Sequence, residues 1–393
     1  MTTKAPTRAE LVGRATDLVD LIRKHAEWQE ENRVIHDDVL RGLHDAGLLR
    51  LRVPKRYGGY EADTRTSVEV IAELARADGS VGWTVSTLII GSWLSGLLPD
   101  SAQDEVFADP DVHIGNSVSP KGVAVPTDGG VILNGKWPFC SGARHSKYFA
   151  HSAVQAVGEN EFVPVFVVVP VSDLTVVDDW NTAGLRATGS VTTIAKDLFV
   201  PESRVIPLLP LVMEGKHLSE ANAGSPLWQA PFSPISAAGA GAVPLGIAKA
   251  AKEQFFERLP DRGITYTNYE NQTDAPITHF QIAEAVGKID EAEFHVHRAA
   301  DRVDSKVAAG EQWSLTERAL ARMEMGASTQ RSREAVDFLE TGSGGSSIYS
   351  HVPMQRIVRD MHAVSLHGLL HPNTNLELYG RVLCGLEPNT QLI

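Results

Sequence analysis

One run of the sequence, residues 135–142, gathers the side chains that a binding site for a planar aromatic heterocycle needs. Trp137 and Phe139 offer flat apolar faces, and a thiol and a hydroxyl follow them at Cys140 and Ser141. Aromatic rings stack on a flat ligand, and a small polar group beside them forms a hydrogen bond with one of its ring nitrogens. The run predicts a binding turn, and it fits equally well a β-hairpin that buries its tryptophan.

The elements that position this run are read from hydrophobic periodicity. Apolar residues recur at helical spacing up to about residue 98, alternate with a period of two from about 113 to 200, and return to helical spacing from 237 onward. The order of helices, strands and then helices indicates an α+β protein. We expect three domains, an N-terminal helical domain at 1–112, a middle β domain at 113–232 and a C-terminal helical domain at 233–393. The last helix is expected at 353–370, ended by Pro372.

The composition excludes several classes of function. The 393 residues carry a formal net charge of -13 and contain no basic runs, which argues against binding to nucleic acid or anionic membranes. The two cysteines, Cys140 and Cys384, are far apart, so a disulfide framework is not expected and a cytoplasmic location fits. The most apolar stretch, 84–98, is too short to span a bilayer and is expected to be a buried helix.

Three histidines near the end of the chain, His362, His367 and His371, raise the question of a metal site. His367 and His371 stand four residues apart, so they would share one face of a helix. No carboxylate or cysteine stands beside them at ligand spacing, and therefore no metal is expected.

Several segments together resemble the acyl-CoA dehydrogenase fold. They keep that family's order over nearly the whole chain, and they comprise residues 53–59, 117–120, 184–190, 197–201, 355–360 and 380–381. The resemblance implies an N-terminal helical domain, a central β-barrel or sandwich domain and a C-terminal four-helix bundle.

Within that fold, the run 137–142 and His367 look like the two-component flavin-dependent monooxygenases, the branch that includes p-hydroxyphenylacetate hydroxylases. A dehydrogenase needs a carboxylate near the flavin to remove a substrate proton, and residues 361–371 contain no acid. The first downstream acid, Glu377, keeps an acyl-CoA dehydrogenase-like FAD oxidoreductase as an alternative. A non-catalytic flavin-binding or ligand-binding protein is a second alternative.

The resemblance also implies roles for individual residues. His367 matches a histidine that donates a hydrogen bond toward a C4a-hydroperoxyflavin, because an imidazole titrates near neutral pH. Cys140 or Ser141 matches the group beside flavin N5, and which of the two faces N5 stays open. Flavin binding is expected from Trp137, Phe139, Ser117, Ser119, Arg262, Gly344 and Gly345. The glycine-rich run 342–347 would come from a neighbouring subunit, which implies a homotetramer, and it also fits an ordinary turn between helices.

The substrate pocket is expected to include Trp93, His145 and His371. Trp93 also fits a plain core tryptophan, and His145 a loop histidine with a structural hydrogen bond. Phenol hydroxylases of this branch often carry a histidine in the second half of the helical domain, and the matching stretch, 90–95, has none. Hydroxylation of an aromatic or polyketide-type ring and N- or S-oxygenation all stay open.

The sequence is thus interpreted as the oxygenase component of a two-component monooxygenase. It would use reduced FMN or FAD and O2, and a separate NAD(P)H:flavin reductase would supply the reduced flavin, since the sequence contains no recognisable nicotinamide site. The other reactant would be a small-molecule substrate.

Overall fold

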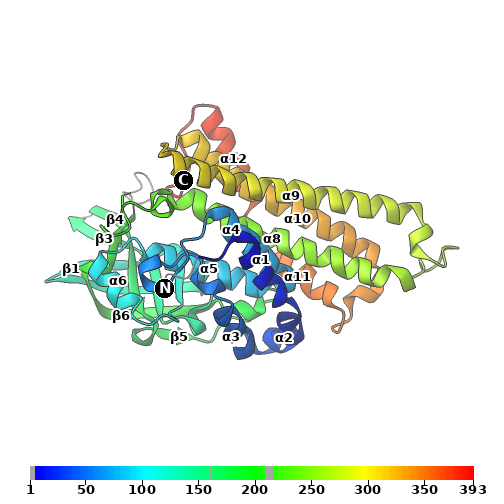
Figure 1. Cartoon of the computed structure of the whole chain (residues 1–393), viewed down its shortest axis with the longest axis horizontal. Helices are drawn as coiled ribbons and strands as arrows, with labels where there is room; N and C mark the ends of the chain where they lie inside the picture. Colours follow the sequence, from blue (N-terminus) through cyan, green and yellow to red (C-terminus); the bar gives the residue numbers. More distant parts are fainter. Residues whose placement is uncertain (1–4, 159–160, 209–215) are drawn as a thin grey trace.

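The computed structural model describes residues 5–158, 161–208 and 216–393. Within these residues, helices come first, a β-sheet follows and long helices end the chain, in the order expected from the sequence (Figure 1). The α+β class is therefore confirmed. The limits expected for the three domains stay a prediction, and residues 159–160 and 209–215 of the second lie outside the described residues.

The N-terminal helices surround one buried helix, α5 (Gly79–Ser95), which has Asp78 as its N-cap. The Asp78 carboxylate accepts hydrogen bonds from the amides of Ser80 and Val81 at 2.9 and 3.1 Å, and so satisfies amides that the first turn leaves free. Every residue of α5 except Thr87 is buried, as the apolar sequence predicts. The other helices here are α1 (Arg8–Asp17), α2 (Val19–Asn32), α3 (Asp37–Asp45), α4 (Thr64–Ala77) and α6 (Asp100–Val106).

Within the described residues, the middle of the chain forms one mixed sheet of seven strands in the order β5-β6-β2-β1-β3-β4-β7, where a barrel or sandwich was expected. Strand β1 runs parallel to β3, and all other neighbours are antiparallel. The two edge strands were not anticipated because each has only three residues, too few for an alternating pattern. The strands are β1 (Ile114–Thr127), β2 (Gly130–Cys140), β3 (Tyr148–Gly158), β4 (Glu161–Pro170), β5 (Thr175–Val177), β6 (Val191–Pro201) and β7 (Val205–Pro207).

The C-terminal helices form a long bundle that projects away from the sheet (Figure 1). They are α8 (Phe232–Arg258), α9 (Pro276–Ala309), α10 (Leu315–Ser343), α11 (Pro353–Ser365) and α12 (Pro372–Leu383). The expectation of a single last helix at 353–370 is wrong, because α11 ends at Ser365 and Pro372 begins α12. Proline fits the first position of a helix, where its missing N–H is not needed. His367 and His371 therefore lie between two helices.

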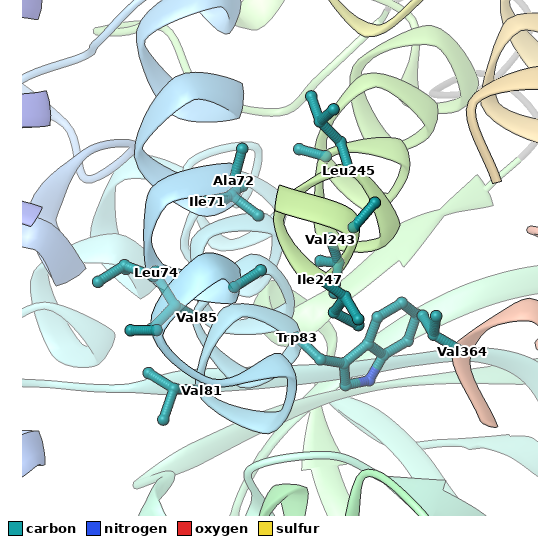
Figure 2. Packing of buried hydrophobic residues seen from close by; sticks show 14 of the residues in the cluster. Ile71, Ala72, Leu74, Val81, Trp83, Val85, Val243, Leu245, Ile247 and Val364 are labelled. Carbon is teal, nitrogen blue, oxygen red and sulfur yellow. The ribbon is translucent and has the colours of Figure 1, made fainter. Parts of the chain in front are cut away.

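The helical parts share a core to which α4, α5, α8 and α11 contribute. Figure 2 shows the indole of Trp83 reaching from α5 toward Ile247 on α8 and Val364 on α11. This side chain connects the N-terminal helices to the segment that carries His367. Among the described residues, no helix is long and apolar enough to cross a bilayer.

Candidate active site

Strand β2 ends in a bulge that turns its last side chains to different sides. Its pairing with β6 shifts register twice, between Leu133 and Gly135 and again between Trp137, opposite Thr193, and Cys140, opposite Val191. Between them Phe139 has a φ of 63°, a left-handed conformation that bulky residues seldom adopt. A bulge of this kind redirects side chains and is common beside functional sites. Here Trp137 and Cys140 are fully buried, whereas the Phe139 side chain is 68% exposed.

Of the two aromatic rings expected to stack on a ligand, Phe139 is exposed and Trp137 is buried. The Trp137 indole donates a hydrogen bond to the Ser152 carbonyl at 2.8 Å, stacks on His151 and is fully buried, so it offers no exposed face to a ligand. The Phe139 ring meets the edge of the Trp180 ring at 5.7 Å between centroids and leaves a face open to solvent. Trp137 is thus a core residue, as the hairpin interpretation predicts.

The choice between Cys140 and Ser141 follows from their neighbours. The Cys140 thiol points into the sheet core, 3.2 Å from both the Trp137 carbonyl and the Thr193 hydroxyl. The Ser141 hydroxyl accepts a hydrogen bond of 2.9 Å from the Trp83 indole N–H. Of the two, Ser141 is the better candidate for the polar group at N5, and that role stays a prediction.

The two cysteines are expected to differ sharply in reactivity. Burial raises the pKa of the Cys140 thiol to about 11, so it stays protonated and shielded, while Cys384 is exposed. Titration of the native protein with a thiol reagent such as DTNB should modify one cysteine per chain, and titration after denaturation should modify two. In the Cys384→Ser variant, no thiol should react in the native state. Rapid reaction of that variant would contradict the placement of Cys140.

His367 lies beside Trp83, with their ring centroids 4.8 Å apart. Its Nδ1 accepts a hydrogen bond of 3.3 Å from the Leu369 amide, so the proton of the neutral imidazole lies on Nε2. Burial lowers the pKa of His367 to about 4, which keeps the ring neutral at physiological pH. Among the described residues, no hydrogen bond to Nε2 is present. The geometry therefore presents an unused N–H donor from a neutral histidine beside Trp83, whose indole in turn donates to Ser141.

Two hydroxyl groups from the segment before β6 extend the site. Ser190 lies 2.7 Å from the Ser141 hydroxyl, and Thr188 lies 2.6 Å from Ser190. Both are buried, and the Thr188 hydroxyl donates to the Leu185 carbonyl at 2.8 Å. The network therefore runs from the indole of Trp83 to the backbone at Leu185.

A buried pair of carboxylates supports that backbone. Asp360 on α11 accepts a hydrogen bond of 2.6 Å from the Leu185 amide. Burial and the charge of Asp78 raise the pKa of Asp360 to about 7, and burial also raises the pKa of Asp78. Arg356 is the neighbouring cation, 4.0 Å from Asp78. We interpret the pair as holding one proton, carried by Asp360, because Asp78 faces both the helix amides and Arg356.

Ser117 and Ser119 lie on β1, where its pairing with β3 is interrupted between Ser117 and Gly122. Ser117 is buried and Ser119 is exposed. The interruption leaves backbone groups near them unpaired within the ladder, which a ligand can use. Their role in flavin binding stays a prediction.

Arg262, Gly344 and Gly345 lie together at the end of the bundle where α10 stops. The Arg262 guanidinium donates to the Ser343 carbonyl, and the φ of 62° at Gly344 is one that glycine adopts without strain. Nearby, Arg258 donates to the Ser346 hydroxyl at 3.0 Å. The two arginines give this end positive charge, which suits a phosphate, and its role stays a prediction.

The residues expected in the substrate pocket have different surroundings. Trp93 is fully buried and its indole donates to the Leu227 carbonyl at 3.1 Å, as expected of a core tryptophan. His145 accepts a hydrogen bond of 3.2 Å from the Ile35 amide, which matches the loop-histidine interpretation. His371 has a buried Nδ1 without a hydrogen-bond partner among the described residues, so it remains a candidate for contact with substrate.

Glu377, the acid that would serve a dehydrogenase, is exposed on α12 and accepts a hydrogen bond from Asn389 at 3.1 Å. It has no contact with the Trp83, Ser141 and His367 group in the described structure.

Sequence reasoning missed four residues of this site: Trp83, Trp180, Thr188 and Ser190. Thr188 and Ser190 belong to the segment 184–190 that carries part of the family resemblance, so a signal existed without a role attached to it. Trp83 gave no signal, because a helix that is apolar on all sides does not reveal which side faces a ligand.

Comparison with known proteins agrees with this geometry. The family models "Acyl-CoA dehydrogenase, N-terminal domain" and "Acyl-CoA dehydrogenase, C-terminal domain" match residues 16–96 and 238–372. The chain is 30% identical over 370 residues to the flavin-dependent monooxygenase, oxygenase subunit HsaA, of Rhodococcus jostii (strain RHA1), covering 94% of this chain and 97% of that one. The chain belongs to the flavin-dependent monooxygenases of the acyl-CoA dehydrogenase superfamily.

Two further proteins are similar to this monooxygenase along its whole length. It is 30% identical to the FADH(2)-dependent resorcinol hydroxylase, oxygenase component, of Rhizobium sp. (strain MTP-10005), covering 97% of this chain and 95% of that one. The solved structure of XiaF from Streptomyces sp. in complex with FADH2 and glycerol superposes with a TM-score of 0.92 at 32% identity, covering 98% of this chain and 97% of that one. The expected acyl-CoA dehydrogenase-like fold is therefore confirmed.

Proposed function

We propose that this monooxygenase is an oxygenase component that takes up reduced FMN or FAD and uses O2 to oxygenate a small aromatic molecule. The observation that carries the proposal is the neutral His367, which has no hydrogen-bond partner for its Nε2–H among the described residues and lies beside Trp83, the residue that donates to Ser141. This arrangement fits an isoalloxazine ring, because an exposed aromatic face at Phe139 and a hydroxyl at Ser141 follow each other on one bulge. The resorcinol hydroxylase named above supports an aromatic substrate by its similarity to this chain.

Each residue of the site has a separate task in this proposal. Bound reduced flavin and O2 supply the oxygen-transfer chemistry. Ser141 would hold the flavin at N5, Phe139 would cover a face of its ring, and Trp83 fixes the positions of Ser141 and His367 through its indole. His367 would supply a hydrogen-bond donor at Nε2 for the reaction, and the burial that lowers its pKa would also keep water away from that donor.

The decisive experiment is an anaerobic titration of the protein with reduced FMN and with reduced FAD, followed by exposure to O2 with and without an aromatic probe such as resorcinol. Tight binding of reduced flavin and an oxygenated aromatic product would support the proposal. Failure to bind either flavin would refute it. In a parallel sample with oxidised flavin, reduction of the flavin on addition of an acyl-CoA would instead indicate a dehydrogenase.

The proposal requires a separate NAD(P)H:flavin reductase, because a reduced flavin must reach the site by diffusion. We also propose that the protein is cytoplasmic, where such reductases and their nicotinamide cofactors are supplied, and that it forms a homotetramer through the C-terminal bundle. Four large apolar side chains on α9 are exposed in the single chain, as expected of a surface that another subunit covers: Ile277, Phe280, Val286 and Phe294. Sedimentation or light scattering should give the mass of four chains, and a monomer would refute the tetramer.

A further inference from the structure

In the chain of hydroxyl groups that begins at Ser141, each hydrogen bond is donated in one fixed direction. The chain runs from Ser141 to Ser190 at 2.7 Å, from Ser190 to Thr188 at 2.6 Å and from Thr188 to the carbonyl oxygen of Leu185 at 2.8 Å. Ser141, Thr188 and Ser190 are each at most 5% exposed, so solvent has little access to the chain. At its other end, the Trp83 indole N–H donates to Ser141 at 2.9 Å.

The direction of donation follows because each hydroxyl group has only one proton to donate. A carbonyl oxygen only accepts, so the single hydroxyl proton of Thr188 is used on Leu185. Ser190 must then donate its proton to Thr188, and Ser141 must donate its proton to Ser190. The indole N–H of Trp180 also donates to the Leu185 carbonyl, at 3.1 Å, which reinforces that end of the chain as an acceptor.

Ser141 is therefore left as a hydrogen-bond acceptor toward a ligand. Its proton is committed to Ser190, one of its two lone pairs receives the Trp83 N–H, and one lone pair remains. Reduced flavin carries a hydrogen on N5 and can donate to that lone pair. Oxidised flavin presents a lone pair at N5 and would need a donor that Ser141 cannot supply without breaking the chain.

We propose that Ser190 and Thr188 are positioning residues that hold Ser141 as an acceptor and thereby make the site select reduced over oxidised flavin. The inference rests on the proposed function, because it takes Ser141 to face N5. It adds a reason why a protein that receives its flavin by diffusion would take up the reduced form and release the oxidised one. Neither Ser190 nor Thr188 needs to touch the flavin to have this effect.

The test measures dissociation constants for oxidised and for anaerobically reduced FMN and FAD, in the wild type and in the variants Ser190→Ala, Thr188→Val and Thr188→Ser. The first two variants free the Ser141 proton to donate to oxidised N5. We expect the ratio of the oxidised to the reduced dissociation constant to fall about fivefold, the size of one net hydrogen bond. The midpoint potential of the bound flavin should move about 20 mV lower for a two-electron couple. Thr188→Ser keeps the hydroxyl and should keep the ratio.

A matched control is Ser92→Ala on α5. The Ser92 hydroxyl is buried and donates a hydrogen bond of 3.1 Å to the Leu88 carbonyl. The ratio for Ser92→Ala should equal that of the wild type. An unchanged ratio in Ser190→Ala, with flavin still bound, would overturn the inference and leave the proposed function intact. A wild type that binds no flavin would overturn both. If Ser190→Ala does not fold, the comparison of Thr188→Val with Thr188→Ser decides, and equal ratios in those two variants would overturn the inference.

Discussion

Replacing His367 with alanine (His367→Ala) should abolish productive oxygenation while leaving the protein folded and able to bind flavin. The imidazole makes only one hydrogen bond within the described structure, to the Leu369 amide, so its loss removes little that supports the fold. Its Nε2–H is the donor that the proposed reaction needs, and a positioned acid of this kind contributes about a hundredfold or more to a rate. Without it, oxygen should leave as hydrogen peroxide. We expect product per reduced flavin oxidised to fall about a hundredfold.

The measurement is the yield of oxygenated probe and of hydrogen peroxide in single-turnover reactions. His362→Ala is the control, because His362 is an exposed histidine near the end of α11, five residues before His367. Since the pKa of His367 is about 4, the wild-type yield should not change between about pH 5 and pH 8, although a free histidine titrates in this interval. A His367→Ala variant that keeps its product yield would remove His367 from the proposed reaction.

Replacing Asp360 with asparagine (Asp360→Asn) should stabilise the protein above pH 7. Because the folded pKa of Asp360 is raised to about 7, the folded state keeps a proton that the unfolded chain loses near pH 4. This carboxyl group therefore contributes most stability below about pH 4, and that contribution is lost as the pH rises toward 7. Asparagine is always neutral and avoids the loss. At about 1.4 kcal/mol per pH unit, the gain in the free energy of unfolding is at most about 4 kcal/mol.

The alanine variant separates the charge from the hydrogen bond. Asparagine still accepts from the Leu185 amide, whereas Asp360→Ala leaves that buried N–H without a partner. We expect Asp360→Ala to be less stable than Asp360→Asn by about 1 to 3 kcal/mol at every pH. Denaturant unfolding at fixed protein concentration between pH 5 and pH 9 gives both differences. A constant difference between wild type and Asp360→Asn over this range would show that Asp360 does not titrate there.

The sequence predicted the order of helices and strands, the location of the turn and His367, because each depends on local pattern or on a family motif. It placed Trp137 on the ligand side of that turn, and the structure places it in the core. The difference arises from the bulge at Phe139, which depends on how β2 pairs with β6. Pairing between strands distant in sequence leaves no mark in the run itself.

The Ser141 network could not be predicted for a similar reason. Its members come from α5, from the end of β2 and from the segment before β6, and each looks like an ordinary small or apolar residue in its own segment. Likewise, the sequence suggested that His367 lies on a helix, since its spacing from His371 suits one. The break at Ser365 instead gives its ring a position that regular helix geometry would not.

The buried hydrogen bond from the Leu185 amide to Asp360 affects when the protein can become active during its synthesis. Leu185 and Asp360 are far apart in the chain, so the ribosome releases α11 long after the sheet has emerged. A nascent chain that lacks α11 would have Leu185 unanchored and no imidazole against Trp83. The Leu185 carbonyl that accepts from Thr188 would then lack the support that Asp360 gives to its residue. The selectivity proposed above for reduced flavin would therefore depend on the docking of α11.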